Sequence, residues 1–514
     1  MIPVLTPDQL RAWDAAAVSA GTPIATLMER AGRAVADGVE ERFGAIARRG
    51  VLVACGAGSN GGDGWLAALL LHERGYPVTV AASENEGHGV AADVRDARDA
   101  AIAGGVTVVT VREPWPDVGV AIDAVLGAGG TGPLRGNVED FVHRLRALAV
   151  PVLAVDAPTG LDLATGIDHG AVPAAVSVTF GGPRRGHLMA RDIVGDIVVA
   201  DIGMPSSPDD WPTLVTSQWA ASQLAPLPTR AHKGTRGRVV IVGGAPSMAG
   251  ATRLAARAAF GAGAGLVHAI VPSASLLVLR TAEPDVQVDE GDFGAMPDAR
   301  VLDLVRDADA VVLGPGMGRV PSRTAFCLAL VGASSASVID ADALHALSGA
   351  LDQLRECGGS RRIVLTPHIG EFRMLFPDCP EDPERDPWAA ASYGADCSGC
   401  TVLLKGVPTV VVAPGRAPRT VAAGNPGLAT GGSGDVLSGI IGTLLAQGMP
   451  PVDAGCVAAQ AHGDAADHAA RRHTARAMRP MDVVAALPDV WRAWARIDAA
   501  LPLLPLLLPR PQGT

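Results

Sequence analysis

The sequence predicts an α/β protein of two domains, each with an open and mostly parallel sheet. Short apolar runs alternate with helix-like segments along the chain, which is the order of repeated β-α-β units. Aromatic residues make up only 4% of the 514 residues and hydrophobic residues 48%, so small aliphatic side chains must fill the cores, as they do around buried parallel strands. A stretch from about residue 203 to 233, which contains several prolines and has no clear period, separates two such series and places the domain boundary.

The first series begins with two helices, which we expect at residues 6–20 and 24–43, with Thr6 and Thr22 as caps. The candidate strands that follow lie at residues 51–55, 77–81, 106–111, 120–124, 152–155, 177–180 and 197–202. Further helices are expected at residues 65–74 and 138–148.

The second series opens at Arg238, and its candidate strands lie at residues 238–242, 266–271, 310–313, 337–339, 363–365 and 401–404. An alanine-rich helix is expected at residues 249–264, and one long helical pattern runs from about Gly434 through Ala470. The predicted domains are therefore residues 1–210 and 211–500, followed by a proline/leucine tail at residues 501–514. Because proline interrupts this short tail, it cannot span a bilayer, and we expect a disordered or docking segment.

Charge and composition exclude several classes of function. The 42 basic and 53 acidic residues give a net charge of −11, which disfavours binding of nucleic acid but allows an anionic small molecule at a helix N-terminus. The N-terminus has no basic flank before an apolar run, so no signal peptide is predicted. The seven scattered cysteines do not suggest a disulfide framework. We expect a cytoplasmic protein that binds neither nucleic acid nor membrane.

A glycine-rich loop at residues 56–64 follows the first strand of the first half and precedes a helix. Glycine lets a ligand approach main-chain amides closely, and the helix dipole favours an anion there. Asp123 and Asp156 follow two other strands, and the carboxyl ends of parallel strands meet at one edge of a sheet. Asn60, Asp123 and Thr159 would then offer oxygen ligands to a hard cation. Asp156 would be free to act as an acid or base, although both aspartates could instead be loop residues or helix caps.

These segments resemble the N-terminal epimerase domain of the NAD(P)H-hydrate repair enzymes, a Rossmann-like α/β/α sandwich. Ser59 stands where that family has an asparagine, and Thr159 keeps the hydroxyl group of the family's serine. The resemblance implies that potassium (K+) is held by Asn60, Asp123 and Thr159. It also implies that the hydrated nicotinamide nucleotide contacts Ser59, Asn60, Gly61, Gly62, Asp63, Gly127, Ala128, Gly129, Gly130, Thr131, Gly132, Pro133 and Asp156.

The implied chemistry is an inversion at one carbon. The hydrate carries a hydroxyl group on the ring carbon next to nitrogen, so this stereocentre can invert through an iminium-like species. The step needs a carboxylate that acts as acid or base, and surroundings that tolerate developing positive charge. Asp156 is the residue that we expect to supply both.

The most informative segment of the second half is residues 424–442, in which a glycine-rich loop leads into a helix. Thr430 to Gly434 would expose successive backbone amides at the helix start, which suits a phosphate group. Asp435 would lie on the first turn, able to accept a proton from a substrate hydroxyl group. The alternative is a glycine-rich packing turn with Asp435 as a cap. His368 and Lys405 each follow a strand and would add a substrate contact and a positive charge for phosphate.

Together these motifs resemble the ribokinase-like α/β/α fold, and within it the ADP-dependent NAD(P)H-hydrate dehydratases. Residues 233–239 and 243–251 fit the start of that domain. The resemblance implies that Ala251, Gly318, His368 and Asp435 contact the hydrate. It implies that ADP, which carries Mg²⁺ (Mg2+) on its phosphates, contacts Lys405, Gly406, Val407, Pro408, Thr409 and Gly434, beside the amides of Thr430, Gly431, Gly432 and Ser433.

The resemblance covers nearly the whole chain and implies a bifunctional repair enzyme. Asp435 would deprotonate the C6 hydroxyl group of the S form of NADHX or NADPHX, which takes a phosphoryl group from ADP. Phosphate then leaves, giving NADH or NADPH, AMP and phosphate, while the epimerase interconverts the R and S forms. Two alternatives are an ATP-dependent kinase of a vitamin-precursor alcohol and a first half that only binds a ligand or a protein. The expected partners are these small molecules and further copies of the chain in a homo-oligomer.

Overall fold

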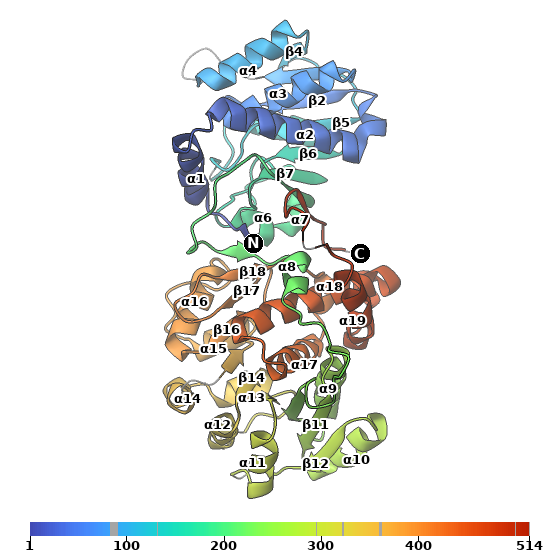
Figure 1. The fold of residues 1–514 in the computed structure, drawn as a ribbon. Coiled ribbons are helices and arrows are strands. Elements are labelled where there is room, and N and C mark those ends of the chain that lie inside the picture. The colour runs from blue at the N-terminus through green and yellow to red at the C-terminus, as the bar shows by residue number, and fades with distance from the viewer. Residues whose placement is uncertain are drawn as a thin grey trace. The chain divides into compact units, whose positions relative to one another are not determined.

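The chain forms two compact units in the computed structural model, which describes residues 1–82, 91–130, 132–294, 296–320, 323–358, 362–498 and 500–512. Residues 2–211 and 502–510 form the first unit, and residues 212–501 belong to the second. Strands and helices alternate in both, and Figure 1 shows helices packed against each sheet. The predicted α/β class, with two mostly parallel sheets, is confirmed.

The strands of the first unit are β1 (Ile2–Pro3), β2 (Val51–Cys55), β3 (Val78–Ala82), β4 (Thr107–Thr110), β5 (Val120–Ala124), β6 (Val152–Val155), β7 (Val176–Phe180), β8 (Asp196–Ala200) and β19 (Leu506–Leu508). Its sheet has the order β19-β8-β7-β6-β5-β2-β3-β4, and β2 pairs in parallel with both β3 and β5. The chain therefore reverses direction across the sheet at β2. Open α/β sheets bind ligands at such a reversal, beyond the carboxyl ends of the strands.

The helices of this unit are α1 (Pro7–Ser19), α2 (Ile24–Ala47), α3 (Ser59–Glu73), α4 (Ala92–Ala103), α5 (Asn137–Ala147), α6 (Arg185–Met189) and α7 (Arg191–Val194). Alternate residues of β2 pack on opposite faces of the sheet, as the two-residue period of a strand requires. Val51 and Val53 pack with α2, α3 and α4, whereas Leu52 packs with α5. The small aliphatic residues of the sequence thus fill a core on each side.

The helix after the glycine loop begins earlier than the sequence suggested. We expected it at residue 65, but α3 begins at Ser59, so that Gly61 and Gly62 lie inside its first turn. A Cβ atom on Gly61 would overlap the carbonyl oxygen of Gly56, and one on Gly62 would lie 2.7 Å from the sulfur of Met28. These glycines therefore serve close packing at the start of the helix.

The C-terminal tail adds an edge strand to the first unit instead of forming a separate segment. β19 runs antiparallel to β8, with Leu507 opposite Val198. The buried side chain of Arg191 donates to the carbonyl oxygens of Leu508, at 3.3 Å, and Pro509. The run of leucines between prolines can therefore pair along an edge, where a missing proline N–H group is tolerated.

The strands of the second unit are β9 (Thr213–Leu214), β10 (Arg238–Val242), β11 (Leu266–Val271), β12 (Gln287–Glu290), β13 (Ala310–Leu313), β14 (Ala336–Ile339), β15 (Arg362–Leu365), β16 (Thr401–Leu404), β17 (Thr409–Val412) and β18 (Arg419–Val421). They follow the order β9-β18-β17-β16-β15-β14-β13-β10-β11-β12. The neighbours from β16 to β12 run parallel, and β17 is antiparallel to both of its neighbours. Here the reversal lies at β10, between β11 and β13.

The helices of this unit are α8 (Ser217–Ser222), α9 (Ala249–Gly261), α10 (Ser273–Ala282), α11 (Ala299–Arg306), α12 (Arg323–Ala333), α13 (Ala341–Ala346), α14 (Leu351–Gly358), α15 (Ile369–Leu375), α16 (Pro387–Ser398), η1 (Pro426–Leu428), α17 (Ser433–Ala446), α18 (Pro451–Ala477) and α19 (Pro480–Trp494). The long helical pattern of the sequence is divided into α17 and α18. Gly448 has a φ of 91° and Pro451 starts α18, so the first helix must end between them. No helix among the described residues is long and apolar enough to cross a bilayer.

We predict that a chain ending at Leu501 has a less stable β8 than the full chain. The edge strand and two acceptors of the Arg191 guanidinium would be lost, at an expected cost of about 2 kcal/mol. Hydrogen exchange at residues 196–200, followed by mass spectrometry, should become faster. A chain that ends at Arg510 keeps β19 and is the control. Equal exchange in both truncated chains would show that β19 does not protect the sheet edge.

Candidate functional sites

A cleft of about 470 Å³ opens beyond the carboxyl ends of β2, β5 and β6 in the first unit. Its polar wall comes from the three segments that the sequence analysis placed at one sheet edge, and includes Ser59, Asn60, Asp63, Gly127, Ala128, Gly129, Gly130 and Asp156. Apolar side chains of α1 and α2, such as Leu10 and Leu27, close the other side. The reversal of the sheet at β2 therefore produces a pocket with both polar and apolar walls.

Asp156 is buried in this cleft and is held by several donors. Its Oδ1 accepts hydrogen bonds from Arg184 at 2.7 Å and from the Thr179 hydroxyl group at 2.9 Å, and its Oδ2 accepts one from the Ala128 N–H at 3.0 Å. The backbone φ of Asp156 is 60°, a conformation that non-glycine residues adopt only where their surroundings impose it. These donors and this backbone fix the carboxylate in one orientation.

His187 forms a hydrogen bond to the backbone of Asp156. The sequence analysis did not single out this histidine. Its Nδ1 accepts the N–H of Arg184 at 2.9 Å, so its Nε2 carries the hydrogen and donates to the carbonyl oxygen of Asp156 at 2.7 Å. Burial lowers the pKa of His187 to about 4, which keeps the ring neutral. Arg184 and His187 follow β7 and stand in no recognisable sequence spacing to Asp156, so only the folded sheet reveals the contact.

Asp123 and Thr159 lie together next to the cleft. The hydroxyl group of Thr159 donates to Asp123 Oδ1 at 2.6 Å, and its N–H donates to Oδ2 at 2.8 Å. Burial raises the pKa of Asp123, although these hydrogen bonds oppose the rise. Asn60 has a buried Nδ2 that finds no hydrogen-bond partner in the described part of the chain, and its Oδ1 lies beside Gly127. Two of the three expected cation ligands, Asp123 and Thr159, are thus hydrogen-bonded to each other, and the third, Asn60, lies in helix α3.

Two further carboxylates, Asp63 and Asp14, line the same cleft. Burial raises the pKa of Asp63 well above its usual range, and the negative charges of Asp156 and Asp14 raise it further. Burial also raises the pKa of Asp14. Asp63 therefore favours its neutral form at the cleft wall opposite a carboxylate that is surrounded by donors.

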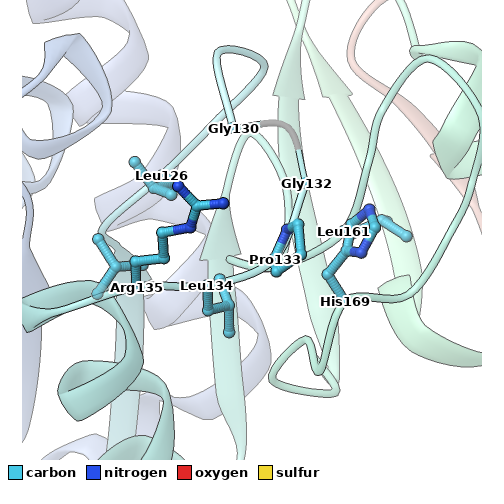
Figure 2. Close-up of a pocket in the computed structure, with 10 residues that line it drawn as sticks. Leu126, Gly130, Gly132, Pro133, Leu134, Arg135, Leu161 and His169 are labelled. Carbon is cyan, nitrogen blue, oxygen red and sulfur yellow. The ribbon is translucent and has the colours of Figure 1, made fainter.

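The segment 127–133 serves two cavities. Gly132 and Pro133 line a second cavity of about 180 Å³, and Gly130 lines both this cavity and the cleft. Figure 2 shows the side chains of Arg135, Pro133 and His169 around it. Thr131 lies outside the described residues. The expected substrate contacts of this segment are therefore divided between the cleft and the smaller cavity.

The second site is built on the start of α17. Gly432 has a φ of 101°, and a Cβ atom there would lie 2.6 Å from Leu254, so the turn before the helix is open only to glycine. The Thr430 hydroxyl group donates to the Gly427 carbonyl at 2.9 Å and shapes this turn, which continues through the exposed Gly431. The first N–H groups of a helix lack partners within it, and the buried Ser433 Oγ has none among the described residues. These donors suit an anion.

Asp435 lies on the first turn of α17 and is partly buried. Burial raises its pKa to about 7; the negative charges of Asp340 and Asp342 act in the same direction, and the positive charge of Lys405 acts against them. A carboxylate with this pKa exists in both protonation states near neutral pH. It can therefore accept a proton and release it again.

Lys405 is held beside this helix by two carboxylates. Its Nζ donates to Asp340 Oδ1 at 2.9 Å and lies 3.7 Å from Glu371 Oε2. Burial disfavours the charge on Lys405, but Asp340 and Glu371 outweigh it and raise its pKa. A Cβ atom on Gly434 would lie 3.4 Å from this Nζ, so the lysine stands directly at the start of α17.

The remaining residues predicted for this site lie around Asp435 and Lys405. His368 caps α15, its Nδ1 accepting the N–H of Glu371 at 3.2 Å, and it pairs along the backbone with Lys405. The turn between β16 and β17 carries Gly406, Val407, Pro408 and Thr409, and Val407 is 70% exposed. This turn therefore continues from Lys405 towards solvent.

Gly318 and Ala251 lie at the neighbouring strand ends. The N–H of Gly318 donates to Asp342 Oδ2 at 2.7 Å. Ala251, near the start of α9, is close enough to Gly316 that a Cβ atom on this glycine would lie 3.0 Å from the Ala251 Cβ. Asp342 also acts electrostatically on Asp435, so this loop belongs to the same site.

His462 is a residue of this region that the sequence analysis missed. It lies in α18 and is buried, and its Nε2 has no hydrogen-bond partner in the described ranges. Burial and the charge of Lys405 lower its pKa to about 4. A histidine within an alanine-rich helix gives no signal in the sequence, because Lys405 is brought close to it only by the fold.

Comparisons with known proteins match both units. Residues 24–186 match the family described as YjeF-related protein N-terminus, and residues 239–489 match the NAD(P)H-hydrate dehydratase family. A bifunctional NAD(P)H-hydrate repair enzyme of Moorella thermoacetica is 36% identical over 498 residues, which are 91% of this chain and 93% of that protein. One from Escherichia coli is 35% identical over 447 residues, which are 85% of this chain and 84% of that protein.

Solved structures similar to the second unit are also found. A ribokinase-like superfamily protein of Enterococcus faecalis is 25% identical, with a TM-score of 0.48, and covers 55% of this chain and 96% of its own. An ADP/ATP-dependent NAD(P)H-hydrate dehydratase of Bacillus subtilis is 23% identical, with a TM-score of 0.47, and covers 55% of this chain and 99% of its own.

We predict that Gly61→Ala destabilises the first unit by about 3 kcal/mol, because the new methyl group would overlap the Gly56 carbonyl oxygen. Gly58→Ala is the matched control in the same loop, since a Cβ atom there meets nothing within 4 Å. Urea unfolding of both variants measures the difference. Equal stability of the two variants would mean that the start of α3 does not pack as tightly as described.

Proposed function

Since the chain belongs to the family of bifunctional NAD(P)H-hydrate repair enzymes, with an epimerase unit followed by a dehydratase unit, we propose that Asp435 is the base of the dehydratase and Asp156 the central carboxylate of the epimerase. The observation that carries the first assignment is the surroundings of Asp435. Asp435, with a pKa of about 7, lies on the first turn of α17, and Lys405 stands at the start of the same helix. A base and a phosphate-binding helix start are the two parts that phosphoryl transfer to an alcohol requires.

In the proposed dehydratase reaction, Asp435 accepts the proton of the C6 hydroxyl group of the S hydrate. The oxygen then takes a phosphoryl group from the nucleotide. Phosphate leaves with the C6–O bonding pair as the ring nitrogen supplies its lone pair, and the resulting iminium ion loses a proton from C5 to solvent, which regenerates NADH or NADPH. Lys405 and the amides of residues 430–434 would face the negative charge that is transferred. Water must be excluded from the phosphoryl group during its transfer, and the partly buried position of Asp435 helps to exclude it.

The nucleotide that we propose is ADP with Mg²⁺, giving AMP and phosphate. The residues present fit its phosphates, since the buried Ser433 Oγ at the start of α17 has no hydrogen-bond partner among the described residues. Asp340 and Asp342 are engaged by Lys405 and Gly318, so the metal would be held mainly by phosphate oxygens and water. His368 and the turn at residues 406–409 would contact the hydrate and the nucleotide from the edge of the site.

In the epimerase, we propose that the hydrated nicotinamide ring enters the cleft beside Asp156. Ser59, Asn60 and the glycines that follow β5 line this cleft, and the fixed carboxylate of Asp156 would face the ring carbon whose configuration inverts. Negative charge at this position stabilises the positive charge that develops as the hydroxyl group leaves.

We also propose potassium as the cation of the first unit. Asp123 is a fully buried carboxylate that is compensated only by hydrogen bonds among the described residues, and a monovalent cation would offset the cost of its burial. Thr159 Oγ1 and the amide oxygen of Asn60 are hard donors of the kind that such an ion prefers. A homo-oligomer and a cytoplasmic location stay predictions from the sequence.

We predict that Asp435→Asn abolishes dehydration while nucleotide binding persists. Without a base, kcat should fall by about 10²- to 10⁴-fold, whereas the amides and Lys405 that hold phosphate are unchanged. The assay follows the absorbance of recovered NADH after a mixture of hydrate epimers is incubated with ADP or with ATP. Asp352→Asn, on the exposed face of α14, is the control. Retained turnover in Asp435→Asn would end this assignment, and a stable phosphorylated alcohol would identify a kinase.

We predict that dehydratase kcat/KM rises with pH through about 7, because Asp435 accepts a proton only when it is ionised. Asp340→Asn removes a negative charge that raises the pKa of Asp435, so the midpoint of the rise should move to lower pH. Lys405→Met removes the opposing positive charge and should move it to higher pH. Full pH profiles of the three proteins test this, and identical midpoints would contradict the role of Asp435.

A further inference from the structure

We propose that Asp63 is the acid of the epimerase, which protonates the departing hydroxyl group, and that the carboxylate of Asp156 is held by its donors to face the positive ring. This inference rests on the function proposed above for the first unit. It separates proton transfer from charge stabilisation and assigns each task to a different carboxylate of one cleft.

The two carboxylates line the same cleft but have opposite surroundings. Asp156 accepts hydrogen bonds from Arg184, Thr179 and the Ala128 N–H. Arg184 is itself almost completely buried, at 1% exposure, so its charge is not weakened by solvent. These donors occupy both oxygens of the carboxylate and hold it in one orientation.

Asp63 has no comparable support. Within the described parts of the chain, no hydrogen bond or ion pair reaches its carboxyl group, which comes from the start of α3 and lines the cleft. The charged groups on the cleft wall are Arg11 and Asp14 from α1, Asp156 after β6 and Arg184 before α6. Burial, Asp156 and Asp14 all raise the pKa of Asp63. A carboxyl group with a raised pKa in the same cleft as a fixed carboxylate is the arrangement that divides acid and anion roles.

The reaction balances with these two groups. Asp63 gives its proton to the C6 hydroxyl oxygen; the C6–O bond breaks, water leaves with the bonding pair, and the nitrogen lone pair forms the C6=N bond. The ring is then positively charged and lies beside the Asp156 carboxylate. Water attacks the opposite face of C6, forms the new C6–O bond and loses a proton to solvent, while the nitrogen recovers its lone pair. Solvent reprotonates Asp63, so nothing is consumed.

The test uses the full chain and the R form of NADHX, and it measures conversion to the S form above the uncatalysed rate. Asp63→Asn resembles the neutral acid in shape, so folding should persist, but it has no proton to give. We expect its kcat to fall by about 10²-fold or more with KM changed only slightly, and Asp63→Glu to recover part of the rate. Dehydration of the S form by the same preparations shows that the second unit is intact, and urea unfolding compared with wild type shows whether the first unit is.

The pH profile separates an acid from a residue that merely maintains structure. An acid works only while protonated, so wild-type kcat/KM should fall as the pH rises through the pKa of Asp63. Asp14→Asn removes a charge that raises this pKa, and the fall should begin at lower pH. In Asp63→Asn the fall should be absent from the residual activity. A normal kcat in Asp63→Asn, or a pH profile that neither variant changes, would overturn the inference while the epimerase function stands. Absence of epimerisation by the wild-type chain would instead overturn the proposed function itself.

Discussion

Both sites depend on helices that pack directly against the strands beside them, an approach that only glycine permits. In the first unit, a Cβ atom on Gly64 would lie 2.5 Å from the Cβ of Ala124 in β5. In the second unit, one on Gly442 would lie 2.5 Å from a methyl group of Val312 in β13. Because these helices lie so close to the sheet, the donors of their first turns reach the sheet edge. The carboxylates that follow the strands then lie near these donors.

Because these side chains are packed closely, two aspartates of one site have pKa values shifted in opposite directions. Asp340 and Asp435 both belong to the second site. Burial would raise the pKa of Asp340, but Lys405 and the Ser438 hydroxyl group outweigh burial and lower it. Among the described residues, Asp435 has no direct donor of this kind, and its pKa rises to about 7. In the first site, Asp156 has several direct donors and Asp63 has none among the described residues. The division of chemical roles is therefore set by which carboxylate receives the available donors.

Local patterns predicted most of the strands, because β-branched residues in short buried runs leave few alternatives. They also placed Asp123, Asp156 and Asp435 at strand ends or at a helix start, where the structure has them. Contacts made across the sheet were not predictable. Arg184 reaches Asp156 from the segment after β7, and His462 lies near Lys405 from a separate helix. The start of α3 was predicted too late because its first turn contains glycines, whose helix propensity is low. Close packing overrides this low propensity there.

Because β19 follows the second unit in the chain but pairs with β8, which precedes that unit, the order of synthesis affects how the first unit folds. β8 is made before the whole second unit, whereas its antiparallel neighbour β19 is made after that unit. During translation, the first unit therefore presents an unpaired strand edge at Ile197, Val198 and Val199 while the second unit is being made. An open edge of this kind can pair with another chain, so the arrival of β19 closes a route to aggregation.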